Sequence, residues 1–209
     1  MKTIVFDLDD TLVPEIAYLK SAFREIASLA NPDDPTVFDK MMECYHGGGD
    51  VFGTLCDEYP ILDKDDLKRV YRHHFPDFTA YQVKPVLEEI KSRGHKLGLI
   101  TDGYSITQRN KIRALGIEAL FDKIVVSEEF GSTKPDPRNY EAFHEFGSDE
   151  YYYVSDNVNK DFIAPNRLGW KTICLIDAGE NIHKQDFNKD LVYLPSIKLQ
   201  TLPELLTYI

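Results

Sequence analysis

Ile4-Val5-Phe6-Asp7-Leu8-Asp9-Asp10-Thr11-Leu12, near the amino terminus, is the most informative stretch of this sequence. It begins with an apolar run typical of a buried strand, and its acids follow at the carboxyl end of that run. Side chains two residues apart in a strand point to the same face, so Asp7 and Asp9 should lie side by side. Neighbouring carboxylates repel each other unless a cation or a shared proton holds them. The stretch therefore predicts a cation site, with an acidic surface loop as the alternative.

From residue 84 onward, apolar runs of strand length alternate with segments of helical period. Strands are predicted at 96–100, 123–127, 151–154, 172–176 and 191–194, and helices at 85–93, 105–115, 137–146, 159–168 and 203–206. Alternation of this kind predicts an α/β fold, a Rossmann-like parallel sheet covered by helices on both faces.

Residues 14–81 break this alternation. Apolar side chains recur there at helical spacing, and no strand pattern lies among them. We therefore expect a small all-helical domain at 14–81, inserted after the first strand, and an α/β core made of residues 1–13 and 82–209. The glycine-rich run 46–50 is expected to be a turn between two helices of the insertion.

Ligands of an open parallel sheet bind at the carboxyl ends of its strands. Thr101-Asp102-Gly103 follows the second predicted strand and Lys134 follows the third. Asp156 follows the fourth, and Asp161 lies five residues beyond it. Taken singly, Thr101 could cap a helix and Lys134 could be an exposed loop residue. Together with Asp7 and Asp9, they predict a single site at one edge of the sheet.

The run Asp7-Leu8-Asp9-Asp10-Thr11 resembles DxDxT, the first motif of the haloacid dehalogenase-like (HAD) hydrolases, most of which are phosphatases. Thr101, Lys134 and the pair Asp156 and Asp161 resemble the remaining motifs of that family, in the same order. The resemblance covers essentially the whole chain, although Ser155 stands where many members have glycine. It implies that the helical insertion is the cap domain of one large HAD subclass, subclass I.

The resemblance also implies a role for each residue. Asp7 would be the nucleophile that forms an aspartyl-phosphate, and Asp9 the general acid and later the general base. The implied phosphate-binding residues are Thr101, Asp102, Gly103 and Lys134. The implied Mg²⁺ ligands are Asp7, Asp9 through its backbone carbonyl, Asp156 and Asp161. Asp161 either binds the ion directly or supports Asp156.

Asp9 helps to choose among the reactions of the family. A leaving alcohol needs a proton donor, whereas dehalogenases lack an acid at this position. The resemblance therefore implies hydrolysis of a small soluble phosphomonoester, such as a nucleotide, a sugar phosphate or a phosphoglycolate-like compound. A sugar-phosphate mutase on the same core is the alternative. A non-catalytic binding protein is a further one, against which the presence of Asp7, Asp9 and Lys134 counts.

Composition narrows the expected partners. The chain has 209 residues and a net charge of -11, which argues against nucleic acid and anionic membrane surfaces. Its scattered cysteines, Cys44, Cys56 and Cys174, predict reduced thiols rather than disulfides or a metal centre. No signal peptide precedes the first strand, and no apolar run approaches the ~18 residues of a membrane span. We expect a cytoplasmic monomer or homodimer whose partner is a small phosphorylated metabolite.

Overall fold

The structure, a computed structural model, describes residues 1–209. A six-stranded parallel sheet with the strand order β3-β2-β1-β4-β5-β6 forms its centre. The strands are β1 (Lys2–Phe6), β2 (Lys96–Thr101), β3 (Lys123–Val126), β4 (Glu150–Ser155), β5 (Lys171–Leu175) and β6 (Ile197–Leu199). The α/β, Rossmann-like parallel sheet predicted from the sequence is confirmed.

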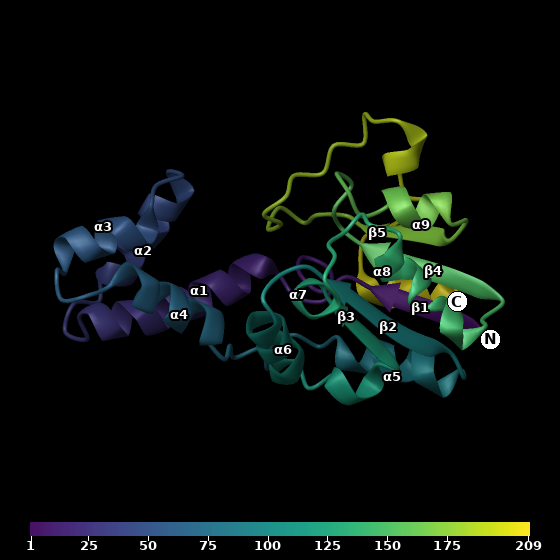
Figure 1. Ribbon diagram of the computed structural model, residues 1–209, viewed down its shortest axis with the longest axis horizontal. Coiled ribbons are helices and arrows are strands. Elements are labelled where there is room, and N and C mark those ends of the chain that lie inside the picture. Colours follow the sequence, from purple (N-terminus) through teal and green to yellow (C-terminus); the bar gives the residue numbers. More distant parts are fainter. The chain divides into compact units, whose positions relative to one another are not determined.

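Helices cover both faces of this sheet (Figure 1). Helices α5 and α6 lie on one face, and α8 and α9 lie on the other. The α-helices are α1 (Glu15–Ala30), α2 (Val37–His46), α3 (Val51–Glu58), α4 (Lys64–His73), α5 (Lys84–Ser92), α6 (Ser105–Ala114), α7 (Ser127–Phe130), α8 (Arg138–Glu141) and α9 (Ile163–Arg167). Short 3₁₀ helices are η1 (Glu118–Leu120), η2 (His144–Phe146), η3 (Leu191–Tyr193) and η4 (Leu202–Thr207).

The chain forms two compact units. The sheet unit consists of Met1–Ile16 and Phe78–Ile209, and the helical unit consists of Ala17–Asp77. The helical unit has its own aromatic core, in which Phe23 packs against the rings of Tyr45, Phe52 and Tyr71. Residues 47–50 lie between α2 and α3, and the Asp50 side chain caps α3 by accepting from the Gly53 amide. The sequence pattern missed α3.

The strand predicted at 191–194 is wrong, because this segment forms the 3₁₀ helix η3 and the sixth strand is β6. The Asn166 side-chain amide of α9 donates to the backbone carbonyls of Val192 and Leu194, both at 2.9 Å. Because these two carbonyls accept from a side chain, they do not form the backbone hydrogen bonds that a strand would need. Leu191 is also 84% exposed, so the apolar run lies on the surface.

Two predicted helices are shorter than expected. The segment 137–146 divides into α8 and η2, and the segment predicted at 159–168 becomes helical only at Ile163. Just before α9, the Asn157 side chain accepts from the Asn159 amide at 2.9 Å, and this local turn replaces the first helical turn. The loop so formed carries Asp161.

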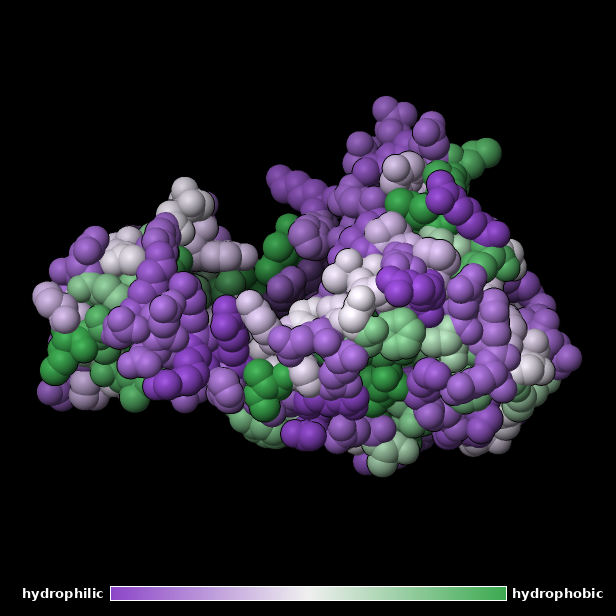
Figure 2. Space-filling view, viewed as in Figure 1, coloured by the Kyte–Doolittle hydropathy of each residue, from purple (hydrophilic) through white to green (hydrophobic).

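The strands are strongly apolar where they are covered on both faces. Ile4, Val5 and Phe6 of β1 are fully buried, as expected for the middle of a parallel sheet. On the face shown in Figure 2, by contrast, the surface is mainly hydrophilic and its hydrophobic residues form separate small groups. No helix is long and apolar enough to span a bilayer.

Candidate active site

The central strand β1 carries the first acid to the carboxyl edge of the sheet. The Asp7 amide donates to the Val154 carbonyl at 2.9 Å, which continues the β1–β4 ladder one residue beyond the strand. This register puts Asp7 beside Ser155, whose hydroxyl oxygen lies 3.4 Å from Asp7 Oδ2. Asp156 follows immediately on the neighbouring chain segment. The order of strands, with β4 next to β1, therefore brings the first and last motifs together.

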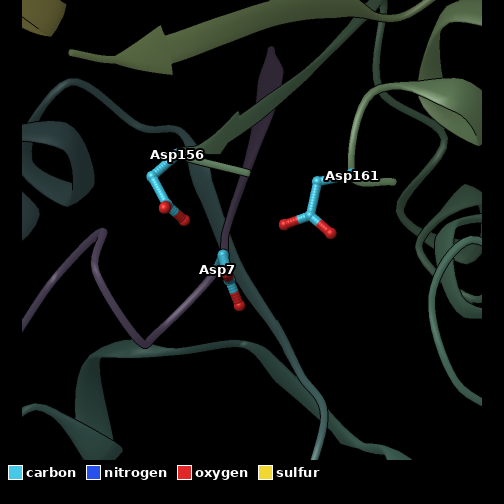
Figure 3. A group of neighbouring side chains, drawn as sticks. All are labelled: Asp7, Asp156 and Asp161. Atoms are coloured by element: carbon cyan, nitrogen blue, oxygen red, sulfur yellow. The ribbon is translucent and has the colours of Figure 1, made fainter. Parts of the chain in front are cut away.

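Asp7, Asp156 and Asp161 form a buried carboxylate cluster (Figure 3). One oxygen from each lies within 4.8 Å of the others, and all three residues are at most 6% exposed. Burial is the main factor that raises the pKa of Asp7 to about 7 and that of Asp156 to about 8. Repulsion between the carboxylates of the cluster contributes to both increases, and the charge of Lys134 opposes them.

This cluster fits a divalent cation. Asp161 Oδ1 is buried and has no hydrogen-bond partner in the protein, although such an oxygen is costly to leave unsatisfied. Carboxylate oxygens are the ligands that hard divalent cations prefer. A cation held here would compensate both the repulsion within the cluster and the unsatisfied Asp161 oxygen. Three of the four residues predicted as metal ligands, Asp7, Asp156 and Asp161, thus lie in this cluster, and the Asp9 carboxylate is not part of it.

Lys134 lies against the cluster and is almost completely buried. Its Nζ is 2.8 Å from Asp7 Oδ1, 2.9 Å from Asp161 Oδ2 and 3.3 Å from the Tyr153 hydroxyl. Burial alone would lower the pKa of Lys134, but the charges of Asp161 and Asp7 outweigh burial and raise it well above its usual value. Lys134 therefore remains a fixed positive charge beside Asp7. Its own backbone amide donates to the Asp102 carboxylate at 3.1 Å.

Asp9 also lies at this edge, but its carboxylate is turned to other partners. Lys111 Nζ is 2.6 Å from Asp9 Oδ1, and Gln108 Nε2 donates to Asp9 Oδ2 at 2.8 Å. The same Gln108 amide contacts Thr101 Oγ1. Gln108 and Lys111 both belong to α6, and neither was predicted as a site residue from the sequence motifs. The fold alone reveals them, because it buries four polar side chains of this helix: Thr107, Gln108, Asn110 and Lys111.

The residues of the Thr101-Asp102-Gly103 turn line two neighbouring pockets. Thr101 is 1% exposed at the end of β2 and lines the same pocket as Asp7. Asp102 lines this pocket too, and its carboxylate is bound by Lys160 Nζ at 2.6 Å. Gly103 lines a neighbouring hollow instead, and its amide donates to the Ser127 hydroxyl at 2.9 Å. Its φ of 137° is one that glycine adopts readily.

The pocket at this edge has a free volume of ≈ 210 Å³. Its lining residues are Asp7, Asp9, Asp10, Glu15, Thr101, Asp102, Lys134, Asp156, Asn157, Lys160, Asp161 and His183. Burial and the charge of Asp9 raise the pKa of Glu15 to about 7. The pocket is therefore polar and small, and every predicted site residue except Gly103 contributes to it.

The polar loop after β5 supplies contacts that sequence reasoning missed. The Asn181 side-chain amide donates to Asp156 Oδ2 at 2.9 Å, and the Ile182 amide donates to Asp10 Oδ2 at 3.0 Å. The Gln185 side-chain amide holds this loop in place by donating to the Asp156 and Leu175 carbonyls. Nothing in the sequence marked these residues, because the loop was recognisable only as polar.

An open parallel sheet with this set of side chains at its carboxyl edge has the arrangement of an α/β enzyme that acts on a charged ligand. The sequence profile described as haloacid dehalogenase-like hydrolase matches residues 4–175, and the chain belongs to this family.

Curated relatives include phosphatases. The chain is 31% identical to a glyceraldehyde 3-phosphate phosphatase of Methanocaldococcus jannaschii, over 84% of this chain and 85% of that protein. It is 27% identical to a phosphoglycolate phosphatase of Aquifex aeolicus, over 82% and 83% of the two chains.

Solved structures show the same fold. A HAD phosphatase from Thermococcus onnurineus aligns with a TM-score of 0.61 at 20% identity, over 100% of this chain and 97% of that one. A putative beta-phosphoglucomutase from Thermotoga maritima aligns with a TM-score of 0.64 at 20% identity, over the whole of both chains.

Proposed function

We propose that this protein is a Mg²⁺-dependent phosphatase that hydrolyses a small phosphomonoester through an aspartyl-phosphate on Asp7. The observation that carries the proposal is the position of the Asp7 carboxylate. It contacts the buried lysine Lys134, its oxygen lies within 4.8 Å of oxygens of Asp156 and Asp161, and it lines a small polar pocket. Phosphoryl transfer needs a positioned nucleophile and fixed positive charge around the transferred group, and this arrangement offers both.

The metal would be held by Asp7, Asp156 and Asp161, together with the backbone carbonyl of Asp9. When bound, Mg²⁺ supplies positive charge that neutralises the phosphate oxygens. Asp161 Oδ1 is the atom of that residue left for the cation, because Oδ2 already accepts from Lys134 and from the Ser155 hydroxyl. The cation would also keep Asp7 ionised, as a nucleophile must be.

In the first step, an Asp7 oxygen attacks phosphorus and forms the acyl-phosphate bond. The phosphorus–oxygen bond to the substrate alcohol breaks, and the leaving oxygen takes its proton from the Asp9 carboxyl. The Thr101 hydroxyl would donate a hydrogen bond to a phosphate oxygen. Lys134, a compact positive charge 2.8 Å from Asp7 Oδ1, would stabilise the negative charge shared by nucleophile and phosphate.

In the second step, a water molecule attacks the phosphorus of the aspartyl-phosphate while Asp9 takes one of its protons. The bond between Asp7 and phosphorus breaks, which releases inorganic phosphate and regenerates the Asp7 carboxylate. Asp9 ends protonated and ready for the next substrate. One residue can serve both steps because the leaving alcohol and the attacking water occupy the same side of the phosphoryl group.

The substrate is proposed to be small and soluble. The pocket, at ≈ 210 Å³, has room for a phosphoryl group, and the curated relatives carry names of phosphatases for small metabolites. We assign the choice among such substrates to the helical unit Ala17–Asp77, as the cap expected from the sequence.

A panel of phosphate esters tests this function. Glyceraldehyde 3-phosphate, phosphoglycolate, hexose phosphates and nucleoside monophosphates would be incubated with wild type, Asp7→Asn and Asp149→Asn, with Mg²⁺ or with excess EDTA. Asp149 is a matched control because its carboxylate is exposed and pairs with the amino terminus. We expect Asp7→Asn to lose about 10³-fold or more in phosphate release, as for other removed nucleophiles, and Asp149→Asn to keep wild-type rates.

Equal phosphate release by wild type and Asp7→Asn would contradict the proposed nucleophile. Undiminished release in excess EDTA would contradict the metal requirement. Isomerisation of a hexose phosphate without net phosphate release would replace the phosphatase by a mutase.

A further inference from the structure

We infer that Gln108 and Lys111 of α6 are positioning residues for the acid–base group Asp9. The inference rests on the proposed function, in which Asp9 exchanges protons with the leaving alcohol and with water. It concerns residues outside the motifs that identified the family. Neither Gln108 nor Lys111 lines the pocket, whereas Asp9 does. Lys111 would therefore act on the reaction through Asp9, and Gln108 through Asp9 and Thr101.

Lys111 holds one oxygen of the Asp9 carboxylate. The distance from Lys111 Nζ to Asp9 Oδ1 is 2.6 Å, and the lysine side chain is only 4% exposed against 20% for Asp9. A charge-assisted contact of this length in a buried setting is much stronger than an exposed surface pair. A buried lysine is expensive unless an anion compensates it, so its placement behind Asp9 requires a specific partner.

Gln108 holds the other oxygen. The Gln108 NH₂ donates to Asp9 Oδ2 at 2.8 Å, and this oxygen can accept whether the Asp9 carboxyl is ionised or carries its proton on another lone pair. With Lys111 on Oδ1 and Gln108 on Oδ2, both oxygens are fixed and the carboxylate has one orientation. The positions of the two donors, three residues apart on a helix, put them on the same face of α6. A rigid element therefore sets the direction of the group that moves protons.

Gln108 also contacts the proposed phosphate-binding hydroxyl. Its Nε2 reaches Thr101 Oγ1 as well as Asp9 Oδ2, and the two hydrogens of one NH₂ group suffice for both. Because Thr101 Oγ1 accepts from Gln108, its own hydrogen is free to point into the pocket. One side chain thereby fixes the acid–base carboxylate and the direction in which Thr101 donates.

A double-mutant cycle tests the inference. The variants are Lys111→Met, Asp9→Asn and the combination, assayed on 4-nitrophenyl phosphate so that turnover stays measurable without a proton donor. We expect Lys111→Met alone to lower kcat by ~10- to 100-fold, the usual effect of removing a supporting partner. In the Asp9→Asn background the same substitution should change kcat by less than about 2-fold, because a residue that acts through Asp9 has nothing left to position.

The matched control is Arg113→Met. Arg113 lies two residues further along α6 and pairs with Glu118 at 3.3 Å instead of Asp9. It should leave kcat unchanged. Inhibition by inorganic phosphate gives a second readout, since a positioning residue for Asp9 should leave the phosphate inhibition constant of Lys111→Met within about 2-fold of wild type.

Equal losses of kcat from Lys111→Met in both backgrounds would overturn the inference alone, because Lys111 would then act independently of Asp9. A phosphate inhibition constant that is more than 10-fold higher in Lys111→Met than in wild type would also overturn the inference, because Lys111 would then bind the substrate. Failure of wild type to hydrolyse any ester would instead overturn the proposed function and the inference with it.

Removing a buried lysine can prevent folding, so thermal unfolding is measured for every variant. If Lys111→Met does not fold, Gln108→Leu takes its place in the cycle. Because Gln108 also contacts Thr101, its loss of kcat should be clearly smaller in the Asp9→Asn background than in wild type, without vanishing. Equal losses in the two backgrounds would overturn the inference. Lys111→Arg provides the rescue test, because it keeps a buried cation behind Asp9. We expect it to recover most of the kcat lost in Lys111→Met, and no recovery would count against a role for the cation.

Discussion

At the scale of single residues, three acids within four positions have three different surroundings. Asp7 belongs to the buried carboxylate cluster, and Asp9 is hydrogen-bonded by side chains of α6. Asp10 accepts hydrogen bonds from two backbone amides that are far apart in the sequence. The sequence could predict that Asp7 and Asp9 share a site, because strand alternation puts them on one face. The role of Asp10 could not be predicted in this way, because its partners depend on tertiary structure. One of them, the Ile182 amide, is 172 residues away.

Asp10 should therefore matter for stability. Its carboxylate accepts from the Glu15 amide at 2.8 Å and from the Ile182 amide at 3.0 Å, and its φ of 55° lies in the left-handed region. Asp10→Ala should cost ~2–3 kcal/mol in the free energy of unfolding, from two lost acceptors and a conformation that alanine disfavours. Asp10→Asn keeps an acceptor and tolerates this φ, so it should cost ~1 kcal/mol. Urea denaturation measures both, and equal costs would contradict this account.

At the scale of elements, local pattern predicts which segments can form strands, and tertiary partners select among them. The apolar run at 191–194 has strand character, yet Asn166 binds its carbonyls and β6 forms a few residues later. The strand β6 is only three residues long and includes a charged residue, Lys198, so its sequence signal is weak. Likewise, α6 was predicted as a helix, but the identity of its buried polar partners required the fold.

The contact between β2 and the segment after α8 gives a test at this scale. A Cβ on Gly98 would lie 2.3 Å from Phe143 Cε1 and 3.0 Å from Val5 Cγ2. Gly98→Ala should therefore destabilise the protein by ~1–3 kcal/mol through overpacking.

The partner of this contact supplies the control. In a Phe143→Leu background, the flat ring edge is gone, and Gly98→Ala should cost clearly less in urea denaturation. The same cost in both backgrounds would show that the ring of Phe143 is not what excludes a side chain at position 98.

At the scale of the whole molecule, the buried acid cluster makes stability depend on pH and on cations. The pKa values of Asp7 and Asp156 rise from 3.8 to about 7 and about 8, mainly through burial. The folded state therefore holds more protons than the unfolded state between pH 4 and 8. Since stability falls with rising pH wherever the folded state binds more protons, these groups destabilise the metal-free protein progressively over that window.

Mg²⁺ should reverse this trend. Thermal unfolding would be followed at pH 6 and pH 8, with Mg²⁺ or with EDTA. A concentration of Mg²⁺ about 100 times its Kd stabilises the folded state by ~2.7 kcal/mol. At a fixed Mg²⁺ concentration we expect a larger gain at pH 8, where the cluster has lost more protons. Asp156→Asn should be more stable than wild type in EDTA at pH 8 and should lose the Mg²⁺ effect. An equal response to Mg²⁺ in this variant would place the cation elsewhere.

The overall plan of the molecule was predictable because parallel strands place their carboxyl ends at one edge. From that rule, the sequence alone predicted that Asp7, Thr101, Lys134 and Asp156 lie in one site. It did not place Gly103, whose amide is used by Ser127, nor Asn181, which reaches Asp156 from a polar loop. Side chains in turns and loops depend on backbone directions that no periodic pattern encodes.

The most direct test of the central claim is chemical trapping of the phosphorylated enzyme. Borohydride reduces an acyl-phosphate to an alcohol, so it would convert an aspartyl-phosphate at residue 7 to homoserine, which peptide mass spectrometry locates. We expect homoserine at position 7 only when substrate and Mg²⁺ are both present, and none in Asp7→Asn. Reduction at another carboxylate, or rapid hydrolysis with no reduced residue during turnover, would contradict it.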